Sequence, residues 1–300
     1  MALASCIDQI NADLPPPPKV LVVNSILNPD SVFRAQVSWV TSTTDSSSRL
    51  LATARVYLLT PGRSAELLRN QGKGRYASST RPATGVPYTL RAEANDYPAV
   101  TATDTLPAAV PIQEAWYSYP TGTDNNNELL GTIVVRFNDP AQTENFYEII
   151  AFQEQYLLRY SRLDQSQDFV LDARSNAALV AEGDAEFNPA TLVFSDKLFN
   201  GQAFELRASF APYGHNGNLT NGQYTVTGNV RLVLRSVSRS YYQYRKSWTR
   251  HLYNQGVKGI GGSLAQTLFL GDPTRMYSNV NGGYGVVVGY AATSKILPLR

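Results

Sequence analysis

Short runs of β-branched and aromatic residues, each closed by turn residues, constrain the fold more than any other feature of this sequence. Residues 33–40 (FRAQVSWV) show the pattern, because apolar and polar side chains alternate along the run. Alternation of this kind places apolar side chains on one face of a strand and polar ones on the other. The turn residues Asn28-Pro29-Asp30 precede this run. Repeated strands with turn signals between them predict a mostly β fold built from sandwiches.

The predicted strands form two groups, which we expect to be two domains. The first group covers residues 19–27, 33–40, 54–59, 74–76, 87–94 and 99–106. The second covers residues 112–119, 129–137, 145–158, 192–194, 204–210, 224–237 and the end of 276–290. A proline-flanked joint near 107–111 separates the groups, which predicts a first sandwich over 19–110 and a larger one over 111–300. Residues 159–188 are mixed and polar, and we interpret them as an excursion from the sheet.

One segment has a helical period instead. From 240 to 255, four aromatic or apolar side chains share one face of a helix; they are Tyr241, Tyr244, Trp248 and Leu252. Ser240 is the predicted N-cap, and Gly256 is the predicted stop. We therefore expect one amphipathic helix near the end of the second domain.

Composition limits the classes of function. Charged residues make up 17% of the chain and the net charge is +2, so the sequence gives little electrostatic support for nucleic-acid binding. The chain has one cysteine and two histidines, His215 and His251, which are far apart. These counts favour neither a disulfide framework nor a metal site. We expect no cofactor and no catalytic residues.

Two aromatic groups are the candidates for contact with a partner or ligand, because tyrosine and tryptophan are enriched at interfaces. One lies at 116–119 and the other at 241–244, where arginine and lysine surround the predicted helix. Core packing is the alternative explanation of the aromatic residues, and an ordinary solvated face is the alternative explanation of the charges. The candidate contacts are Trp116, Tyr117, Tyr119, Tyr242, Arg245, Lys246 and Arg250.

The segment Leu3-Ala4-Ser5-Cys6 resembles the lipobox of bacterial lipoproteins, in which the cysteine carries acyl chains. Several acyl chains anchor a protein stably, because each buried methylene contributes about 0.8 kcal/mol. We therefore expect lipidation at Cys6, with an incidental cysteine as the alternative. Only Met1–Ser5 precede Cys6, so we expect the signal peptide to be incomplete here. Residues 1–18 would form a lipobox remnant and a tether that ends in four prolines. Ile7, in place of an aspartate, favours the outer membrane by the same resemblance.

Short motifs are spread over nearly the whole chain. They are Leu21-Val22-Val23-Asn24 with Asn28-Pro29-Asp30, Tyr88-Thr89-Leu90, Thr101-Ala102-Thr103-Asp104-Thr105-Leu106-Pro107, Phe137-Asn138-Asp139-Pro140, Phe194-Ser195-Asp196 with Phe199-Asn200-Gly201, Tyr241-Tyr242-Gln243-Tyr244, and Ser278-Asn279-Val280 with Gly282-Gly283-Tyr284-Gly285. In their order and spacing they resemble a family of Bacteroidota outer-membrane lipoproteins, the domain of unknown function 4249. The first domain is also similar to the immunoglobulin-like or transthyretin-like sandwich. The family is often encoded beside TonB-dependent receptors, so the resemblance implies a partner rather than a reaction.

From these features we expect a non-catalytic lipoprotein, anchored to the outer membrane on either its periplasmic or its surface face. Its expected role is accessory subunit of a TonB-dependent transporter or a related complex. A stand-alone surface protein that binds a glycan or peptide is the alternative, and a hydrolase is the least supported. Exposed aromatic residues over a groove would favour glycan or peptide binding, whereas a flat apolar patch would favour the transporter partner.

Overall fold

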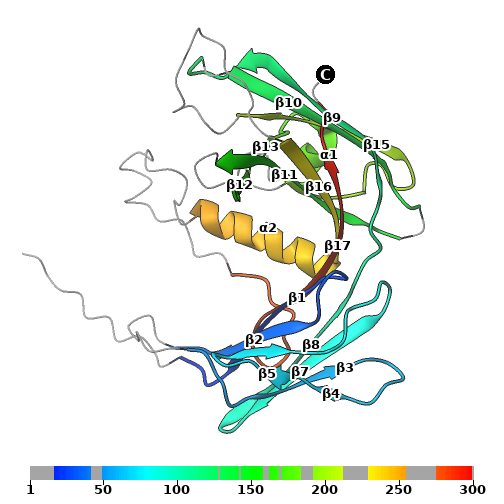
Figure 1. Cartoon of the computed structure of the whole chain (residues 1–300). Coiled ribbons are helices and arrows are strands. Elements are labelled where there is room, and N and C mark those ends of the chain that lie inside the picture. The colour runs from blue at the N-terminus through cyan, green and yellow to red at the C-terminus, as the bar shows by residue number, and fades with distance from the viewer. Residues whose placement is uncertain are drawn as a thin grey trace, which may run out of the picture.

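The computed structural model describes residues 17–41, 49–127, 129–141, 143–157, 162–168, 171–183, 192–211, 229–254 and 275–298. Cys6, most of the proline-rich tether and the loop that holds His215 lie outside these residues. The described part is mostly β, as predicted, with several sheets and two helices (Figure 1). Among the described residues, no helix combines the length and the apolar character that crossing a bilayer requires.

The N-terminal unit is a two-layered β-structure. One layer contains β1 (Leu21–Leu27), β2 (Arg34–Trp39), β6 (Arg75–Ala77) and β5 (Arg69–Asn70), in that order. The other contains β4 (Glu66–Leu67), β3 (Arg55–Leu59), β7 (Pro87–Ala94) and β8 (Tyr97–Thr105). Alternate side chains of both layers enclose a core in which the rings of Phe33 and Tyr88 lie 4.7 Å apart, edge to face. Tyr76 joins the layers to the connecting loops, because its hydroxyl donates to the Leu51 carbonyl and accepts from the Ala54 amide.

The C-terminal unit also has two facing layers. The first is the four-stranded sheet of β13 (Leu171–Asp172), β15 (Ala203–Phe210), β10 (Leu129–Asn138) and β9 (Ile112–Thr123). The second contains β12 (Arg162–Asp168), β11 (Phe146–Leu157), β16 (Asn229–Val237) and β17 (Tyr284–Ile296), with β14 (Leu192–Ser195) paired to β11. Phe137 on β10 packs against Tyr147 on β11 at 4.8 Å, at the centre of the core between them. The excursion expected at 159–188 instead contains β12, β13 and the short helix α1 (Ala177–Ala181).

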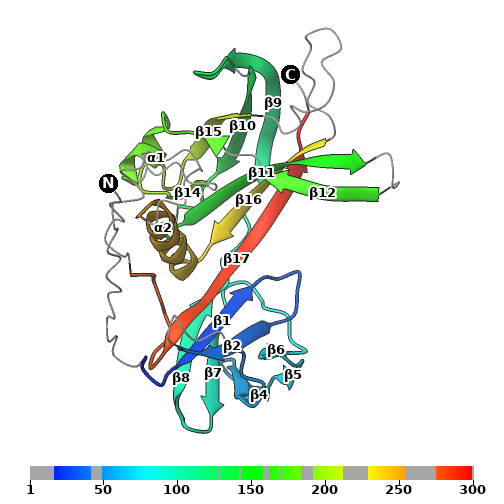
Figure 2. The same cartoon turned by 90° about the vertical axis from the view of Figure 1, so that its left-hand side faces the viewer.

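Strand β17 belongs to both units. Its first half, from Tyr284 to Gly289, pairs in parallel with β1, and its second half pairs antiparallel with β16 (Figure 2). Val280 and Val287 consequently lie in the N-terminal core, although they come from the end of the chain. The structure therefore differs from the expected division at 110, because a continuous sheet passes through both units.

Helix α2 (Arg239–Asn254) forms close to the predicted range. Its N-cap is Ser238 rather than the predicted Ser240, because the Tyr241 amide donates to the Ser238 hydroxyl oxygen at 3.1 Å. Tyr241 is buried with Phe146, Val286 and Val288 in a small cluster that attaches α2 to β11 and β17. Trp248 does not follow Tyr241 into that cluster and is 36% exposed.

Asp104 on β8 meets the start of α2 in a buried position. The Ser238 hydroxyl donates to its carboxylate, while the Gly289 amide donates to the Ser238 oxygen at 3.3 Å. Burial raises the pKa of Asp104 to about 6, against the opposing effect of the hydrogen bonds from Ser238 and from neighbouring amides. This carboxyl group therefore links both units and the helix at one point.

The raised pKa of Asp104 predicts a specific pH dependence of stability. Between pH 4 and 6 an unfolded chain has released this proton while the folded chain retains it, so the free energy of unfolding falls as the pH rises. The full shift corresponds to about 3 kcal/mol, of which about 2 kcal/mol is lost between pH 4 and pH 7. The side chain at position 104 does not titrate in the Asp104→Asn variant. The unfolding free energy of this variant, relative to that of the parent, should therefore rise by about 2 kcal/mol from pH 4 to pH 7. Urea unfolding at both pH values measures this, and a pH-independent difference would contradict it.

Candidate functional site: a groove beside helix α2

A groove with a volume of about 760 Å³ runs along α2 between the helix, the segment 275–278 and the start of β17. Its lining residues are Glu182, Tyr242, Gln243, Lys246, Ser247, Arg250, Arg275, Met276, Tyr277, Ser278 and Tyr284. Three of the predicted contact residues, Tyr242, Lys246 and Arg250, therefore lie in one groove. They share it because α2 places residues four apart on the same side of the helix.

Glu182 fixes the floor of the groove. It follows α1 and accepts hydrogen bonds from the Tyr242 hydroxyl and from the Ser195 amide and hydroxyl. Its second oxygen also forms an ion pair with Lys246 at 3.0 Å. Burial on its own would raise the pKa of Glu182, but these donors and the ammonium group hold it below its ordinary value. Glu182 is therefore ionised at neutral pH and ties α2 to β14.

The balance of charge in the groove is basic. Among the described lining residues, Lys246, Arg250 and Arg275 face one carboxylate, that of Glu182. Lys246 pairs with Glu182 and 18% of its side chain is exposed, and Arg250 and Arg275 are both exposed residues. This excess of basic over acidic side chains in the described lining favours an acidic ligand.

Tyrosine side chains line the rest of the groove. Tyr242 packs on Phe146 with ring centres 4.6 Å apart, and the Lys246 ammonium lies 5.4 Å from the Tyr242 ring centre. The Tyr277 amide donates to the Ser247 hydroxyl at 2.9 Å, which fixes segment 275–278 to α2. Tyr284, at the start of β17, is 44% exposed. An exposed tyrosine beside a basic rim can contact both apolar and polar parts of a ligand.

Arg245 has a different role from the one the sequence suggested. Its guanidinium forms an ion pair with Glu148 at 2.9 Å, and Arg235 on β16 pairs with the same carboxylate at 2.7 Å. Tyr241 donates a third hydrogen bond to Glu148 at 2.8 Å. Glu148 is fully buried, so these three side chains compensate its charge. Arg245 therefore helps to fix α2 to strands β11 and β16, and it does not line the groove.

The other predicted aromatic group, on β9, is divided between the two faces of its sheet. Tyr117 is only 8% exposed and contacts Phe210 in the core, which corrects its assignment to a contact surface. Tyr119 is partly buried against the same core. Trp116 lies on the opposite face, with the Arg136 guanidinium 5.2 Å from its ring centre. The structure therefore forms no exposed cluster from these three side chains.

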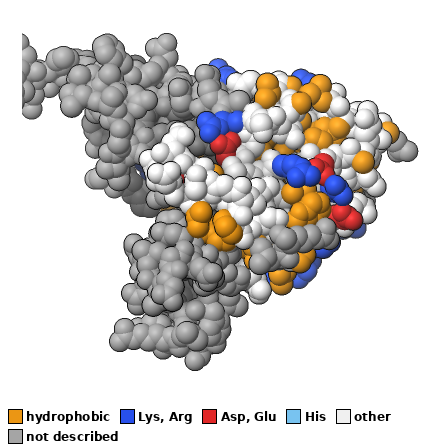
Figure 3. Space-filling model, turned by 90° about the horizontal axis from the view of Figure 1, so that it is seen from above, with side chains coloured by type: hydrophobic (Ala, Val, Ile, Leu, Met, Phe, Trp, Pro, Cys, Tyr) orange, Lys and Arg blue, Asp and Glu red, His pale blue; other side chains and the backbone are white. Residues whose placement is uncertain are grey.

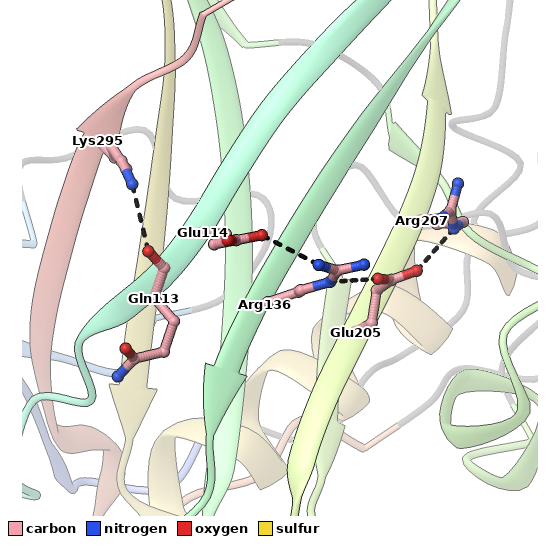
Figure 4. Close-up of polar contacts among 6 residues, drawn as sticks. All are labelled: Gln113, Glu114, Arg136, Glu205, Arg207 and Lys295. Carbon is pink, nitrogen blue, oxygen red and sulfur yellow. Dashed lines mark hydrogen bonds and ion pairs between the residues drawn. The ribbon is translucent and has the colours of Figure 1, made fainter. Parts of the chain in front are cut away.

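Charged side chains across β9, β10 and β15 pair with one another beside Trp116. Arg136 lies between Glu114 and Glu205, and Arg207 contacts Glu205 from the other side (Figure 4). The view from above shows basic and acidic side chains adjacent to one another, with hydrophobic side chains between them (Figure 3). Exposed pairs of this kind contribute little to stability. Since they neutralise each other, this face is a weaker candidate for binding a charged ligand than the α2 groove.

The described ranges contain no group of three or more His, Cys, Asp or Glu side chains that could hold a metal ion. His251 lies on α2 next to Trp248, with ring centres 6.2 Å apart. Glu182, Arg275, Tyr277 and Tyr284 complete the groove but were not predicted from the sequence. Only the fold brings them to α2, because they lie far from it along the chain.

A family model described as a domain of unknown function (DUF4249) matches residues 7–296. The chain belongs to this family. No curated protein matches the chain. Two of the DUF4249 motif regions contribute Tyr242, Gln243, Ser278 and Tyr284 to the groove, whereas other motifs form structural joints. Asp139, for example, accepts a hydrogen bond from the Gly201 amide at 2.8 Å and another from the buried Tyr147 hydroxyl.

Two further motif residues, Asn24 and Asn279, stabilise the contact between β17 and the N-terminal unit of this DUF4249 chain. Asn24 accepts a hydrogen bond from the Val286 amide at 3.1 Å. Asn279 accepts one from the Val287 amide at 2.9 Å and donates one to the Val287 carbonyl at 2.7 Å. Both asparagines hold strand ends in place. The cations of the groove, Lys246, Arg250 and Arg275, lie outside the motifs, although four other lining residues lie within them.

Proposed function

We propose that this DUF4249 protein is a lipid-anchored, non-catalytic binding protein of the bacterial outer membrane, with a TonB-dependent receptor barrel as its partner. The observation that supports this partner most is the charge of the α2 groove, and not the flat apolar patch expected from the sequence. Among the described lining residues, Arg250, Arg275 and Lys246 outnumber one carboxylate, and three tyrosines line the walls. Such a groove suits an acidic, extended segment of another protein. Acyl chains on Cys6 would keep the groove close to a membrane partner.

A stand-alone surface protein that binds a glycan or peptide is the second candidate. The position of Tyr284 favours it, because a 44% exposed aromatic ring at the edge of a groove can stack on a sugar or a peptide side chain. The two candidates use the same groove. In the first candidate the bound segment belongs to another protein of the outer membrane, and in the second it is a free glycan or peptide. Isolation of the protein from its own membrane distinguishes the two candidates.

The test is affinity isolation of the full-length, acylated protein from detergent-solubilised native outer membrane, followed by mass spectrometry. We expect a TonB-dependent barrel in stoichiometric amount. The variant Arg250→Glu with Arg275→Glu should recover at least tenfold less of it, because the groove becomes acidic. The matched control is Arg63→Glu with Arg81→Glu, an equal charge change on exposed positions of the N-terminal unit. Recovery of the lipidated protein alone would contradict the proposed partner and favour the second candidate.

A further inference from the structure

A second groove, of about 930 Å³, lies on the N-terminal unit and has no part in the proposed partner contact. It covers the outer face of the layer formed by β1, β2, β6 and β5, together with the loops at its edge. Its lining residues are Asn24, Ser25, Ile26, Ser31, Val32, Arg34, Ala35, Gln36, Arg69, Gln71, Arg75, Tyr76, Ala77, Ser78 and Ser79. Three of them are arginines, and none of these described lining residues is acidic.

Strand register places the three arginines on one face of the sheet. Arg34 on β2 and Arg69 on β5 are both paired with Ala77 on β6, so they flank this small residue in a single cross-strand row. Arg75 lies two residues before Ala77 on the same strand and therefore on the same face. Adjacent strands are about 4.8 Å apart, which puts the backbones at Arg34 and Arg69 about 10 Å from each other. Long arginine side chains can converge over the alanine from both sides.

The arginines have no carboxylate partner within the part of the chain that the structure describes. All three are exposed, and the ion pairs of the N-terminal unit there involve other residues, such as Arg55 and Arg91 with Glu93. Glu66 on β4 is near Ser78 and Ser79, but its oxygens accept hydrogen bonds from those serines and from Thr80. Three guanidinium groups on one concave face therefore favour a ligand that carries oxyanions, which arginine binds through two parallel hydrogen bonds.

The remaining side chains indicate what carries those oxyanions. Gln36 and Gln71 offer amide groups, and Ser31 offers a hydroxyl, which suit the hydroxyl groups of a sugar. Ile26 is 56% exposed and can contact the apolar face of a sugar ring. The aromatic ring among the lining residues, that of Tyr76, is 2% exposed and cannot stack on a nucleobase. We infer that this groove, which we name the arginine groove, binds a saccharide that bears sulfate or phosphate esters.

Calorimetric titration of the full chain with defined saccharides tests this inference. The probes are a heparin-derived hexasaccharide, its fully desulfated counterpart, and pentamannose 6-phosphate. We expect at least one of the two esterified probes, the heparin-derived hexasaccharide or the pentamannose 6-phosphate, to bind. If sulfate is the ester recognised, the desulfated hexasaccharide should bind at least tenfold more weakly than the sulfated one. Which ester binds more tightly identifies the source of the oxyanion. Binding should weaken as salt is added, because exposed charges are screened.

Variants separate binding in the arginine groove from a general effect of charge. Arg34→Gln, Arg69→Gln and Arg75→Gln together should weaken binding of the preferred probe at least tenfold. The matched control combines Arg63→Gln, Arg81→Gln and Lys197→Gln, which removes the same charge from exposed positions outside both grooves. The control should bind like the parent, and circular dichroism should show both variants folded. Equal loss in both variants, or no binding of either esterified probe by the parent, would overturn the inference without affecting the proposed partner.

Discussion

Replacement of Glu148 by alanine is expected to lower the free energy of unfolding by about 3–5 kcal/mol, because it leaves two partly buried arginines without their counter-charge. Glu148 is fully buried and holds Arg235 at 2.7 Å and Arg245 at 2.9 Å. Burial raises the pKa of Tyr241, so its hydroxyl remains protonated as the third donor to this carboxylate. Urea unfolding followed by circular dichroism measures the loss.

The matched control is Glu144→Ala. Glu144 forms an ion pair with Arg239, whose side chain is 63% exposed, and exposed pairs contribute about 0–1 kcal/mol. A second variant, Glu148→Gln, keeps the shape of the side chain and isolates the effect of the charge. If Glu148→Ala and Glu144→Ala changed stability equally, the buried pair would not be what attaches α2 to the sheet.

Substitution of Gly285 by alanine is the second change with a large expected effect, about 3 kcal/mol or more in unfolding free energy. Gly285 has a φ of +109°, and a Cβ atom there would lie 2.1 Å from the Val23 carbonyl oxygen on β1. The alanine variant can avoid this contact only by separating β17 from β1, where the two units share a sheet. We therefore expect hydrogen exchange at the β1 amides to accelerate as well.

Gly62→Ala is the control for the backbone conformation alone. Gly62 also has a positive φ, +71°, but apart from Gly62 itself and its two chain neighbours no residue has an atom within 4 Å of the position that its Cβ would take. Alanine at such a position costs about 1–2 kcal/mol through its own conformation. Equal effects of the two substitutions would show that the contact with β1 contributes nothing.

Sequence patterns predicted most strands because the information is local. Residues 87–94 alternate along their whole length, and β7 has the same bounds. Residues 159–188 lack an apolar period, so β12, β13 and α1 were missed. The role of β17 could not be predicted either, because its partners β1 and β16 are chosen by register and twist across the whole molecule. Pairings between strands that lie far apart in the sequence cannot be predicted from local patterns.

The site was predicted in part for the same reason. The sequence put Tyr242, Lys246 and Arg250 among the candidate contacts, and all three line the groove. Spacing could not show that Arg245 would instead meet Glu148, whose position depends on the pairing of β11 with β16. Tyr117 was assigned to a surface because an alternating strand does not say which of its faces is buried. In β9, Trp116 lies on the outer face of the sheet and Tyr117 is buried in the core.

Site-specific photocrosslinking in the native outer membrane tests the central claim, that the α2 groove contacts a membrane partner, most directly. A photoreactive phenylalanine derivative would replace Tyr284, at the edge of the groove, in the full acylated chain. The same derivative at Leu67, which is 56% exposed on the N-terminal unit, serves as the control. We predict a crosslink from position 284 to a TonB-dependent barrel and none from position 67. Crosslinking to such a barrel from position 67 but not from 284, or from neither, would contradict the account.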